Sequence, residues 1–207
     1  MIKLLVCAAT AMELEAVKPL AEGAETLVTG AGSPSTAFRL AGYFSRQIPD
    51  LAIQVGIAGS FRPEIKTGQV VQVREDCFAD LGAQDRDGSF IPLASLIRED
   101  FNPFNAYWLN PPERYKMEGV LEVKAISVNR VNGRQEEIDE AIKQFHPDIE
   151  TMEGAAFFAS CMVHRVPCLQ LRAISNRVEP RNREAWDIPS ALRQLHQNLA
   201  RLLESLG

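Results

Sequence analysis

Three polar side chains, far apart along the chain, are of types that could do chemistry together. Glu15 lies one turn into a predicted helix after the first predicted strand, where the positive helix end keeps a carboxylate ionised and able to accept a proton from water. Glu153 opens another predicted helix, and its carboxylate can accept hydrogen bonds from two adjacent sugar hydroxyls. Asn176 ends an apolar strand, and its amide can both donate to and accept from the edge of a planar base.

Each of these residues also has a purely structural interpretation. Glu15 could be a solvated glutamate on a surface helix, since glutamates are rarely fully buried. Glu153 could simply stabilise the positive end of a helix, and the neighbouring Met152 could be an ordinary core side chain. Asn176 could be a turn residue at the exit of its strand. The residue types alone leave both interpretations open.

Two glycine-rich turns follow predicted strands, at residues 30–32 and 56–59. Glycines at such turns let backbone amides approach a ligand closely. Neither turn is the G-x-G-x-x-G motif of dinucleotide-binding proteins, and neither contains the lysine of a phosphate-binding P-loop. These turns therefore give little support to a nucleotide-dependent oxidoreductase.

The cysteines and histidines form no pattern that predicts a metal site. Cys7, Cys77, Cys161 and Cys168 include no C-x-x-C pair, and the three histidines are scattered along the chain. We therefore predict no metal site.

The composition is that of an ordinary globular chain. Its 207 residues are 46% hydrophobic and 24% charged with a net charge of −5, which fits one domain over residues 1–207. Nucleic-acid binding is disfavoured, because it relies on Lys and Arg to neutralise phosphates. The apolar run at residues 4–9 is shorter than a signal core or a membrane span, so we expect a cytoplasmic protein that does not engage a membrane.

Strands and helices alternate along most of the chain. Apolar runs predict strands at residues 2–7, 26–29, 51–55, 68–74, 121–128 and 168–174, and helical spacing predicts helices at 12–20, 35–47, 135–145, 153–164 and 189–206. This order predicts an α/β fold with a largely parallel sheet, and the candidate residues fall near the ends of its strands. Residues 80–119, rich in proline and aromatic residues, are typical of a structured excursion, either a lid or an interface loop.

Five short motifs occur in an order that resembles one superfamily, the purine nucleoside phosphorylases and the methylthioadenosine/adenosylhomocysteine nucleosidases. The motifs lie at residues 11–15, 56–59, 131–133, 152–153 and 172–176, so the resemblance spans nearly the whole chain. It implies a single-domain, three-layer α/β/α phosphorylase-like fold around a central mixed, largely parallel sheet. It also implies a homodimer or a larger homo-oligomer.

Within the superfamily, residues 175–186 resemble the futalosine hydrolases most closely. This resemblance implies hydrolysis of the N-glycosidic bond of futalosine, an inosine-like nucleoside with a carboxybenzoyl group on its 5′ side, in menaquinone biosynthesis. Hypoxanthine would leave, with no metal or organic cofactor. By the same resemblance Glu15 is the carboxylate that deprotonates water, Met152 and Glu153 bind the ribose, and Asn176 contacts the base.

The resemblance implies further contacts with the substrate. Arg130 and Val131 fall on the base-contacting loop, where the nucleosidases have an aromatic residue, which leaves base stacking open and can limit Arg130 to backbone contacts. Ile57 and Ala58 fall on the turn at residues 56–59 and are expected beside the substrate.

The carboxybenzoyl end requires a cation and an apolar surface. Arg181 and Trp186 lie in the loop at residues 177–186, and arginine pairs with carboxylates through two parallel hydrogen bonds. We expect this loop, together with the aromatic residues at 101–108, at that end of the substrate.

Asn176 departs from the nucleosidases, which have an aspartate at this position. A protonated aspartate suits adenine, whereas asparagine can donate to O6 and accept from N7–H of a 6-oxopurine. A mismatched buried polar edge costs about 1–3 kcal/mol, which favours hypoxanthine as the leaving base. Gln54 stands near the place where hexameric phosphorylases have a phosphate-binding arginine, which favours water over phosphate.

Three other functions fit parts of this pattern. A nucleosidase for 6-amino nucleosides, such as aminofutalosine or methylthioadenosine, would differ in the base that it accepts. A purine nucleoside phosphorylase would require phosphate. A non-catalytic nucleoside-binding protein belongs to a different class, and the combination of Glu15, Glu153 and Asn176 disfavours it.

Overall fold

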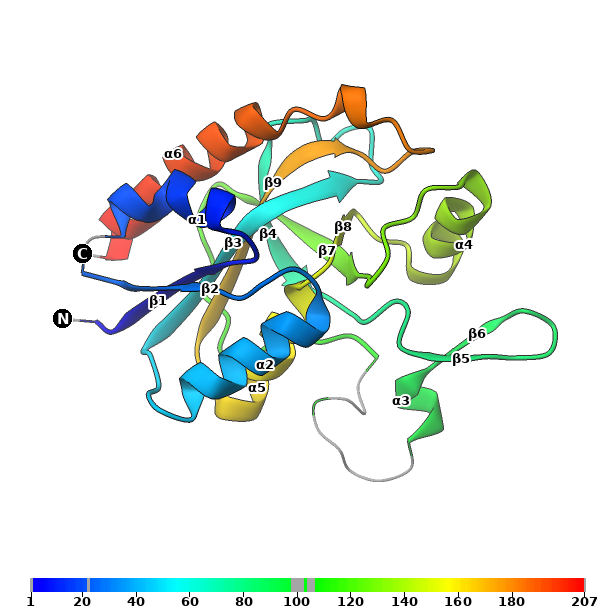
Figure 1. The fold of residues 1–207 in the computed structure, drawn as a ribbon, viewed down its shortest axis with the longest axis horizontal. Helices are drawn as coiled ribbons and strands as arrows, with labels where there is room; N and C mark the ends of the chain where they lie inside the picture. The colour runs from blue at the N-terminus through cyan, green and yellow to red at the C-terminus, as the bar shows by residue number, and fades with distance from the viewer. Residues whose placement is uncertain (1, 22, 98–102, 104–106, 207) are drawn as a thin grey trace.

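A mixed sheet of seven strands forms the centre of the molecule in the computed structural model, which describes residues 2–21, 23–97, 103 and 107–206 (Figure 1). The strands are β1 (Leu4–Ala8), β2 (Glu25–Val28), β3 (Leu51–Ser60), β4 (Val70–Glu75), β7 (Leu121–Ser127), β8 (Ile149–Thr151) and β9 (Cys168–Arg177). Their order in space is β2-β1-β3-β8-β7-β4-β9. The pairs β3–β8 and β4–β9 are antiparallel, and the other pairs in this sheet are parallel.

Strand β9 pairs with β3 as well as with β4. The strands β3, β8, β7, β4 and β9 therefore close into a ring, while β1 and β2 extend from β3. As a result, residues at the ends of β3, β8 and β9 become neighbours although they lie far apart in the sequence.

Helices cover both faces of the sheet, so the predicted layered α/β fold is confirmed. α1 (Ala11–Val17) packs on α6 (Ile188–Leu206) at one face, and α2 (Ser33–Phe44) packs on α5 (Gly154–His164) at the other (Figure 1). α4 (Gln135–Phe145) connects β7 to β8. Two short 3-10 helices are also present: η1 (Lys18–Leu20) follows α1, and η2 (Arg183–Ala185) lies between β9 and α6.

Apolar side chains fill both interfaces between the sheet and the helices. Phe157 and Phe158 of α5 are fully buried on one side, and Leu195 and Leu199 of α6 are fully buried on the other. Burying side chains of this size stabilises the fold by about 1.5–3 kcal/mol each. α5 is apolar around most of its surface because the sheet and α2 enclose it, whereas α6 buries a single stripe.

The predicted elements differ from the observed ones mainly at their ends. α4 begins and ends at the predicted residues, whereas β3 and β9 continue beyond their apolar runs because their last residues pair with each other. The sequence pattern does not predict β8, since three residues are too few to show an alternating pattern.

The segment at residues 80–119 contains three short elements. β5 (Gly82–Gln84) and β6 (Phe90–Pro92) form an antiparallel hairpin, which α3 (Leu93–Leu96) follows. Of the aromatic residues expected near the substrate, Phe101 and Phe104 lie outside the described residues. Tyr107 stacks on Phe145 with ring centroids 5.8 Å apart. Among the described helices, none has the length and apolar character needed to cross a membrane.

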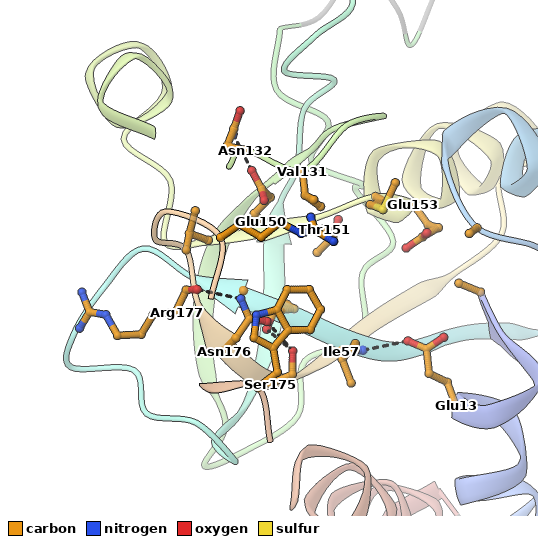
Figure 2. Close-up of a pocket in the computed structure, with 18 of the residues that line it drawn as sticks. Glu13, Ile57, Val131, Asn132, Glu150, Thr151, Glu153, Ser175, Asn176 and Arg177 are labelled. Atoms are coloured by element: carbon orange, nitrogen blue, oxygen red, sulfur yellow. Dashed lines mark hydrogen bonds between the residues drawn. The ribbon is translucent and has the colours of Figure 1, made fainter. Parts of the chain in front are cut away.

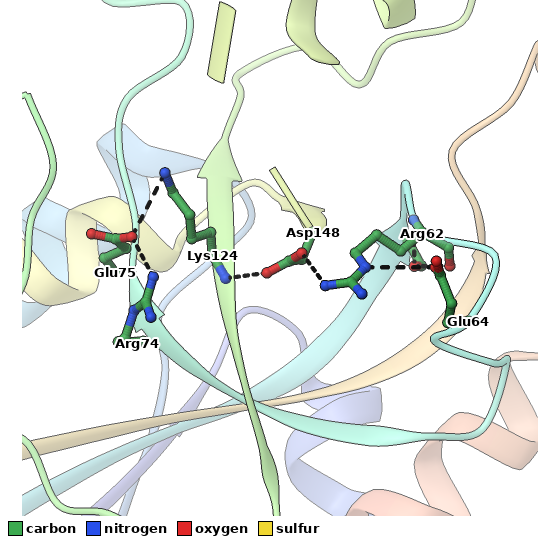
Figure 3. A network of polar contacts seen from close by, with 7 residues as sticks. Arg62, Glu64, Arg74, Glu75, Lys124 and Asp148 are labelled. Atoms are coloured by element: carbon green, nitrogen blue, oxygen red, sulfur yellow. Dashed lines mark hydrogen bonds and ion pairs between the residues drawn. The ribbon is translucent and has the colours of Figure 1, made fainter. Parts of the chain in front are cut away.

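A chain of polar contacts fixes the start of β8 (Figure 3). Asp148, directly before β8, accepts a hydrogen bond from the Lys124 backbone N–H at 2.8 Å and pairs with Arg62 at 3.0 Å. Glu75 of β4 in turn contacts Arg74 and Lys124. Exposed ion pairs contribute only about 0–1 kcal/mol each, so the pairing of β8 with β3 and β7 and the backbone hydrogen bond to Asp148 position this strand.

A cluster of polar side chains interrupts the apolar core beneath the ends of the strands. Arg172 of β9 is 1% exposed, and it donates hydrogen bonds to Gln170 Oε1 at 3.0 Å and to Gln54 Oε1 at 2.6 Å. The fully buried Asp76 accepts a hydrogen bond from the Ser127 hydroxyl at 3.1 Å. Burial raises the pKa of Asp76 to about 7, while the Arg172 charge and the Ser127 hydroxyl act in the opposite direction.

We expect Asp76→Asn to change how stability depends on pH. The pKa of Asp76 rises from 3.8 to about 7 on folding, so the folded protein keeps a proton between about pH 4 and pH 7 that the unfolded chain releases. This group therefore lowers the stability as the pH rises through that window. Each pKa unit corresponds to about 1.4 kcal/mol, so the free energy of unfolding should fall by a few kcal/mol more in the wild type than in the variant.

Urea titrations at several pH values within that window measure this difference. Asp87→Asn is the matched control, because Asp87 is exposed and its hydrogen bonds to Ser89 lower its pKa. Equal pH slopes for the wild type and Asp76→Asn would contradict the prediction.

Candidate active site

A cavity of about 230 Å³ lies at the ends of β1, β3, β8 and β9 (Figure 2). Most of the predicted site residues line it, namely Ile57, Ala58, Val131, Met152, Glu153, Asn176, Arg181 and Trp186. Polar residues for which no role was predicted also line it, among them Thr10, Glu13, Asn132, Glu150 and Ser175. The structure therefore brings together, around one cavity, carboxylates that can bind a sugar and an amide that can bind a base.

Glu13 is the carboxylate that α1 directs into the cavity. Thr10 is the N-cap of α1 and forms a capping box with Glu13, whose Oε2 accepts hydrogen bonds from Thr10 N at 3.0 Å and from Thr10 Oγ1 at 2.7 Å. The other oxygen, Oε1, accepts a hydrogen bond from the Ile57 backbone N–H at 3.1 Å. Glu13 is 5% exposed, and donors from two elements orient both of its oxygens.

Glu15 does not lie in the cavity, contrary to the prediction. Its side chain is 65% exposed and pairs with Lys18 Nζ at 3.2 Å, which matches its alternative interpretation as a surface glutamate. Two residues along an α-helix rotate a side chain by about 200°, so Glu13 and Glu15 point in nearly opposite directions. The Thr10-x-x-Glu13 spacing of a capping box is the sequence signal that identifies the inward-facing carboxylate.

Glu153 lies directly before α5 and is 6% exposed. Its Oε1 accepts a hydrogen bond from the Gly32 backbone N–H at 2.8 Å, so the glycine turn at residues 30–32 orients this carboxylate. Burial raises the pKa of Glu153; the Arg172 charge and the Gly32 amide act in the opposite direction, and the Glu13 charge adds to the rise. Met152 lines the cavity next to it.

The buried Arg172 approaches this end of the cavity at Gly56. A Cβ atom at position 56 would lie 2.4 Å from Arg172 Nη1 and 3.0 Å from Glu13 Oε1, so a glycine is needed for both groups to come this close to β3. A positive charge near carboxylates favours their charged forms. Gln54 is itself buried and accepts a hydrogen bond from Arg172, so it does not line the cavity.

Asn176 lies at the other end of the cavity from Glu13 and Glu153 (Figure 2). A bulge in β9 against β3 places Asn176 opposite Gly59, and such bulges redirect side chains. The Asn176 Oδ1 accepts a hydrogen bond from Ser175 Oγ at 2.7 Å, and its Nδ2 donates to the Arg177 carbonyl at 2.8 Å. These contacts orient the amide and leave one N–H donor and one oxygen lone pair for a ligand.

The loop after β7 contributes Val131 but not the side chain of Arg130. Arg130 is 81% exposed and pairs with Glu137 at 2.9 Å, so its predicted place beside the base is not observed for the side chain. Asn132, next in the loop, donates a hydrogen bond to Glu150 Oε2 at 2.6 Å. Burial raises the pKa of Glu150 to about 7, with Asn132 lowering it and the charge of Asp80 raising it.

The loop after β9 lines another side of the cavity. Arg181 and Trp186 both line it, whereas Tyr107 and Trp108 do not. In the part of the chain that the structure describes, no three residues among His, Cys, Asp and Glu are arranged to hold a metal ion.

The chain is similar to proteins of known fold and activity. Residues 25–206 match the Phosphorylase superfamily. A futalosine hydrolase of Thermus thermophilus is 31% identical over 186 residues, which cover 87% of this chain and 81% of that protein. A futalosine hydrolase of Streptomyces coelicolor is 35% identical over 163 residues, which cover 75% and 67% of the two chains.

A solved structure shares the fold. A mutant of the Helicobacter pylori 5′-methylthioadenosine/S-adenosylhomocysteine nucleosidase (MTAN), with 5′-methylthioadenosine in its active site, matches with a TM-score of 0.81 and 15% identity, over 99% of both chains. With the matched relatives above, this chain belongs to the phosphorylase superfamily and, within it, to the family of the futalosine hydrolases.

Proposed function

We propose that this protein hydrolyses the N-glycosidic bond of futalosine and releases hypoxanthine and the dehypoxanthine sugar product. The proposal rests on one observation: two oriented carboxylates and an oriented amide, from Glu13, Glu153 and Asn176, line a single cavity. Relatives named futalosine hydrolases, at 31% and 35% identity, support the same substrate. The cavity end with two carboxylates suits the sugar and water, and the amide end suits the base.

In this mechanism Glu153 binds the ribose. The Gly32 amide holds its Oε1, so the carboxylate is fixed where it can accept hydrogen bonds from the 2′ and 3′ hydroxyls. As the C1′–N9 bond lengthens, positive charge develops on the sugar ring. A carboxylate held beneath the diol stabilises this charge more strongly in the transition state than in the ground state.

Glu13 positions the attacking water. Thr10 and the Ile57 amide already hold its two oxygens, and a free lone pair on the carboxylate can accept a hydrogen bond from water. Glu13 takes the proton as the water oxygen bonds to C1′. The role predicted for Glu15 therefore passes to Glu13, two residues earlier.

Asn176 contacts the leaving base. Its free N–H donates to O6 of hypoxanthine as the electron pair of the C1′–N9 bond moves onto the base. When N7 takes a proton from solvent, the Asn176 oxygen accepts a hydrogen bond from the resulting N7–H. Ser175 and the Arg177 carbonyl hold the amide in one orientation, so donor and acceptor cannot exchange places. This contact also strengthens as negative charge builds on the departing ring.

Water is a better nucleophile for this cavity than phosphate. A phosphate dianion at C1′ would lie close to Glu13 and Glu153, and like charges a few ångströms apart repel each other. The uncharged Gln54 is directed at Arg172 and away from the cavity, so it supplies no phosphate contact. Hydrolysis therefore fits these charges better than phosphorolysis.

The carboxybenzoyl end of the substrate requires a cation and an apolar surface. Arg181 and Trp186 line the cavity and could contact the carboxybenzoyl group, the arginine through its carboxylate and the tryptophan through its ring. We propose a cytoplasmic homo-oligomer, a dimer or larger, that serves menaquinone biosynthesis.

Substituting the two α1 glutamates tests which carboxylate activates water. Glu13→Gln should lower kcat for futalosine by roughly 10²–10⁴-fold, because an amide cannot take the proton from water. Glu15→Gln is the matched control on the opposite face of the same helix, and it should keep near-wild-type activity. Chromatographic assay of released hypoxanthine measures both. Strong loss in Glu15→Gln with none in Glu13→Gln would return the role to Glu15.

Asn176→Asp tests how the base is recognised. An ionised aspartate repels O6, whereas a protonated one suits a 6-aminopurine, so kcat/KM for aminofutalosine relative to futalosine should rise roughly tenfold to a hundredfold. Asn198→Asp on α6, away from the cavity, is the control and should leave the ratio unchanged. If Asn176→Asp also leaves the ratio unchanged, Asn176 does not discriminate between the two bases.

A further inference from the structure

Three neighbouring strands place Glu150 and Asn176 in one row across the sheet. Gly59 of β3 pairs with Glu150 of β8 on one side and with Asn176 of β9 on the other. Paired residues on adjacent strands point to the same face of a sheet. Both side chains therefore stand on the cavity face, two strand spacings or about 10 Å apart at the backbone, and Figure 2 shows them on opposite sides of the cavity.

Gly59 leaves the space between these two side chains open. A Cβ atom at position 59 would lie 3.2 Å from Asn176 Nδ2 and 2.9 Å from Val178 Cγ2. Any larger residue would press against the amide and occupy the middle of the row. The row therefore consists of the Glu150 carboxyl group, the open space at Gly59 and the Asn176 amide.

We propose that Glu150 is a second base-reading residue, which accepts the N1–H of a 6-oxopurine while Asn176 contacts O6 and N7. This inference rests on the proposed function, since it concerns the same cavity and the same leaving base. N1 and N7 lie on the two sides of O6, N1 with O6 on the Watson–Crick edge and N7 with O6 on the Hoogsteen edge. Groups on the two sides of Gly59 can therefore contact N1 from one side and O6 and N7 from the other. A 6-aminopurine has a lone pair and no hydrogen at N1, and this lone pair would face the lone pairs of the carboxylate.

The surroundings of Glu150 orient its carboxylate so that it can accept a hydrogen bond from N1–H. Asn132 donates to Oε2 at 2.6 Å and orients the carboxylate, and Asn132 is therefore a positioning residue. Glu150 is 7% exposed, so few water molecules can donate hydrogen bonds to its carboxylate. Because Glu150 lines the cavity, a bound ligand can donate them instead. Burial raises its pKa to about 7, and an N1–H donor would favour the charged form.

Glu150→Gln should reverse the discrimination at N1. Asn132 would hold the new amide oxygen and turn the amide NH₂ toward N1, where it meets N1–H of a 6-oxopurine but matches the lone pair of a 6-aminopurine. We expect kcat/KM for futalosine relative to aminofutalosine to fall roughly tenfold to a hundredfold. Glu136→Gln on α4 is an exposed control and should leave the ratio unchanged.

A second variant and a binding measurement keep the test decisive if Glu150→Gln does not fold. Asn132→Ala retains the carboxylate but frees it, and it should lower the same ratio by a few-fold. Calorimetry with free hypoxanthine and adenine should show a wild-type preference for hypoxanthine that either variant reduces. Unchanged ratios and unchanged base preference in the folded variants would overturn the role of Glu150 while leaving futalosine hydrolysis intact. If the wild type cleaves no nucleoside, the proposed function fails instead, and the base-binding measurement still decides the role of Glu150.

Discussion

A buried guanidinium is the constraint around which this site is built. Arg172 is 1% exposed, and an unpaired charge at such a depth costs several kcal/mol. Two glutamine carbonyls accept its hydrogen bonds, while the carboxyl groups of Glu13, Glu153 and Asp76 lie near it and come from three different parts of the chain. The start of α1, the start of α5 and the end of β4 are therefore held around one cation. The same charge acts against the rise that burial causes in the pKa of Glu153.

The closed ring of strands gives the cavity its two different ends. β3 carries Gly56 beneath the carboxylates and Gly59 beneath the base end, three residues further along. Because β8 and β9 flank β3 on both sides, their side chains at the Gly59 level face each other across an open space. In the proposed mechanism, sugar chemistry and base recognition are thereby separated along a single strand. Each end can be altered by substitution without removing the groups of the other.

Much of the fold and part of the site could be predicted from the sequence. Helical and strand periodicity identifies most elements, and Glu153 and Asn176 stand at the element ends where sheets of this class form sites. The helix position of the carboxylate that we propose to activate water is harder to identify, because Glu13 and Glu15 differ by two residues and the motif contains both. The capping box decides between them, since it fixes the rotation of α1.

Other features depend on long-range pairing that local patterns do not record. β8 is too short to show periodicity, so the sequence pattern does not identify Glu150 as a strand residue that lines the cavity. The pairing of β9 with β3, which closes the ring and creates the bulge at Asn176, joins segments more than a hundred residues apart. Arg130 pairs with Glu137 on α4, a contact that only the folded chain makes evident.

Futalosine cleavage in H₂¹⁸O, with and without inorganic phosphate, is the direct test of whether water is the nucleophile. We expect hypoxanthine release at a rate that does not depend on phosphate, with one ¹⁸O atom at C1′ of the sugar product by mass spectrometry. A sugar 1-phosphate product, or turnover only when phosphate is present, would contradict this expectation.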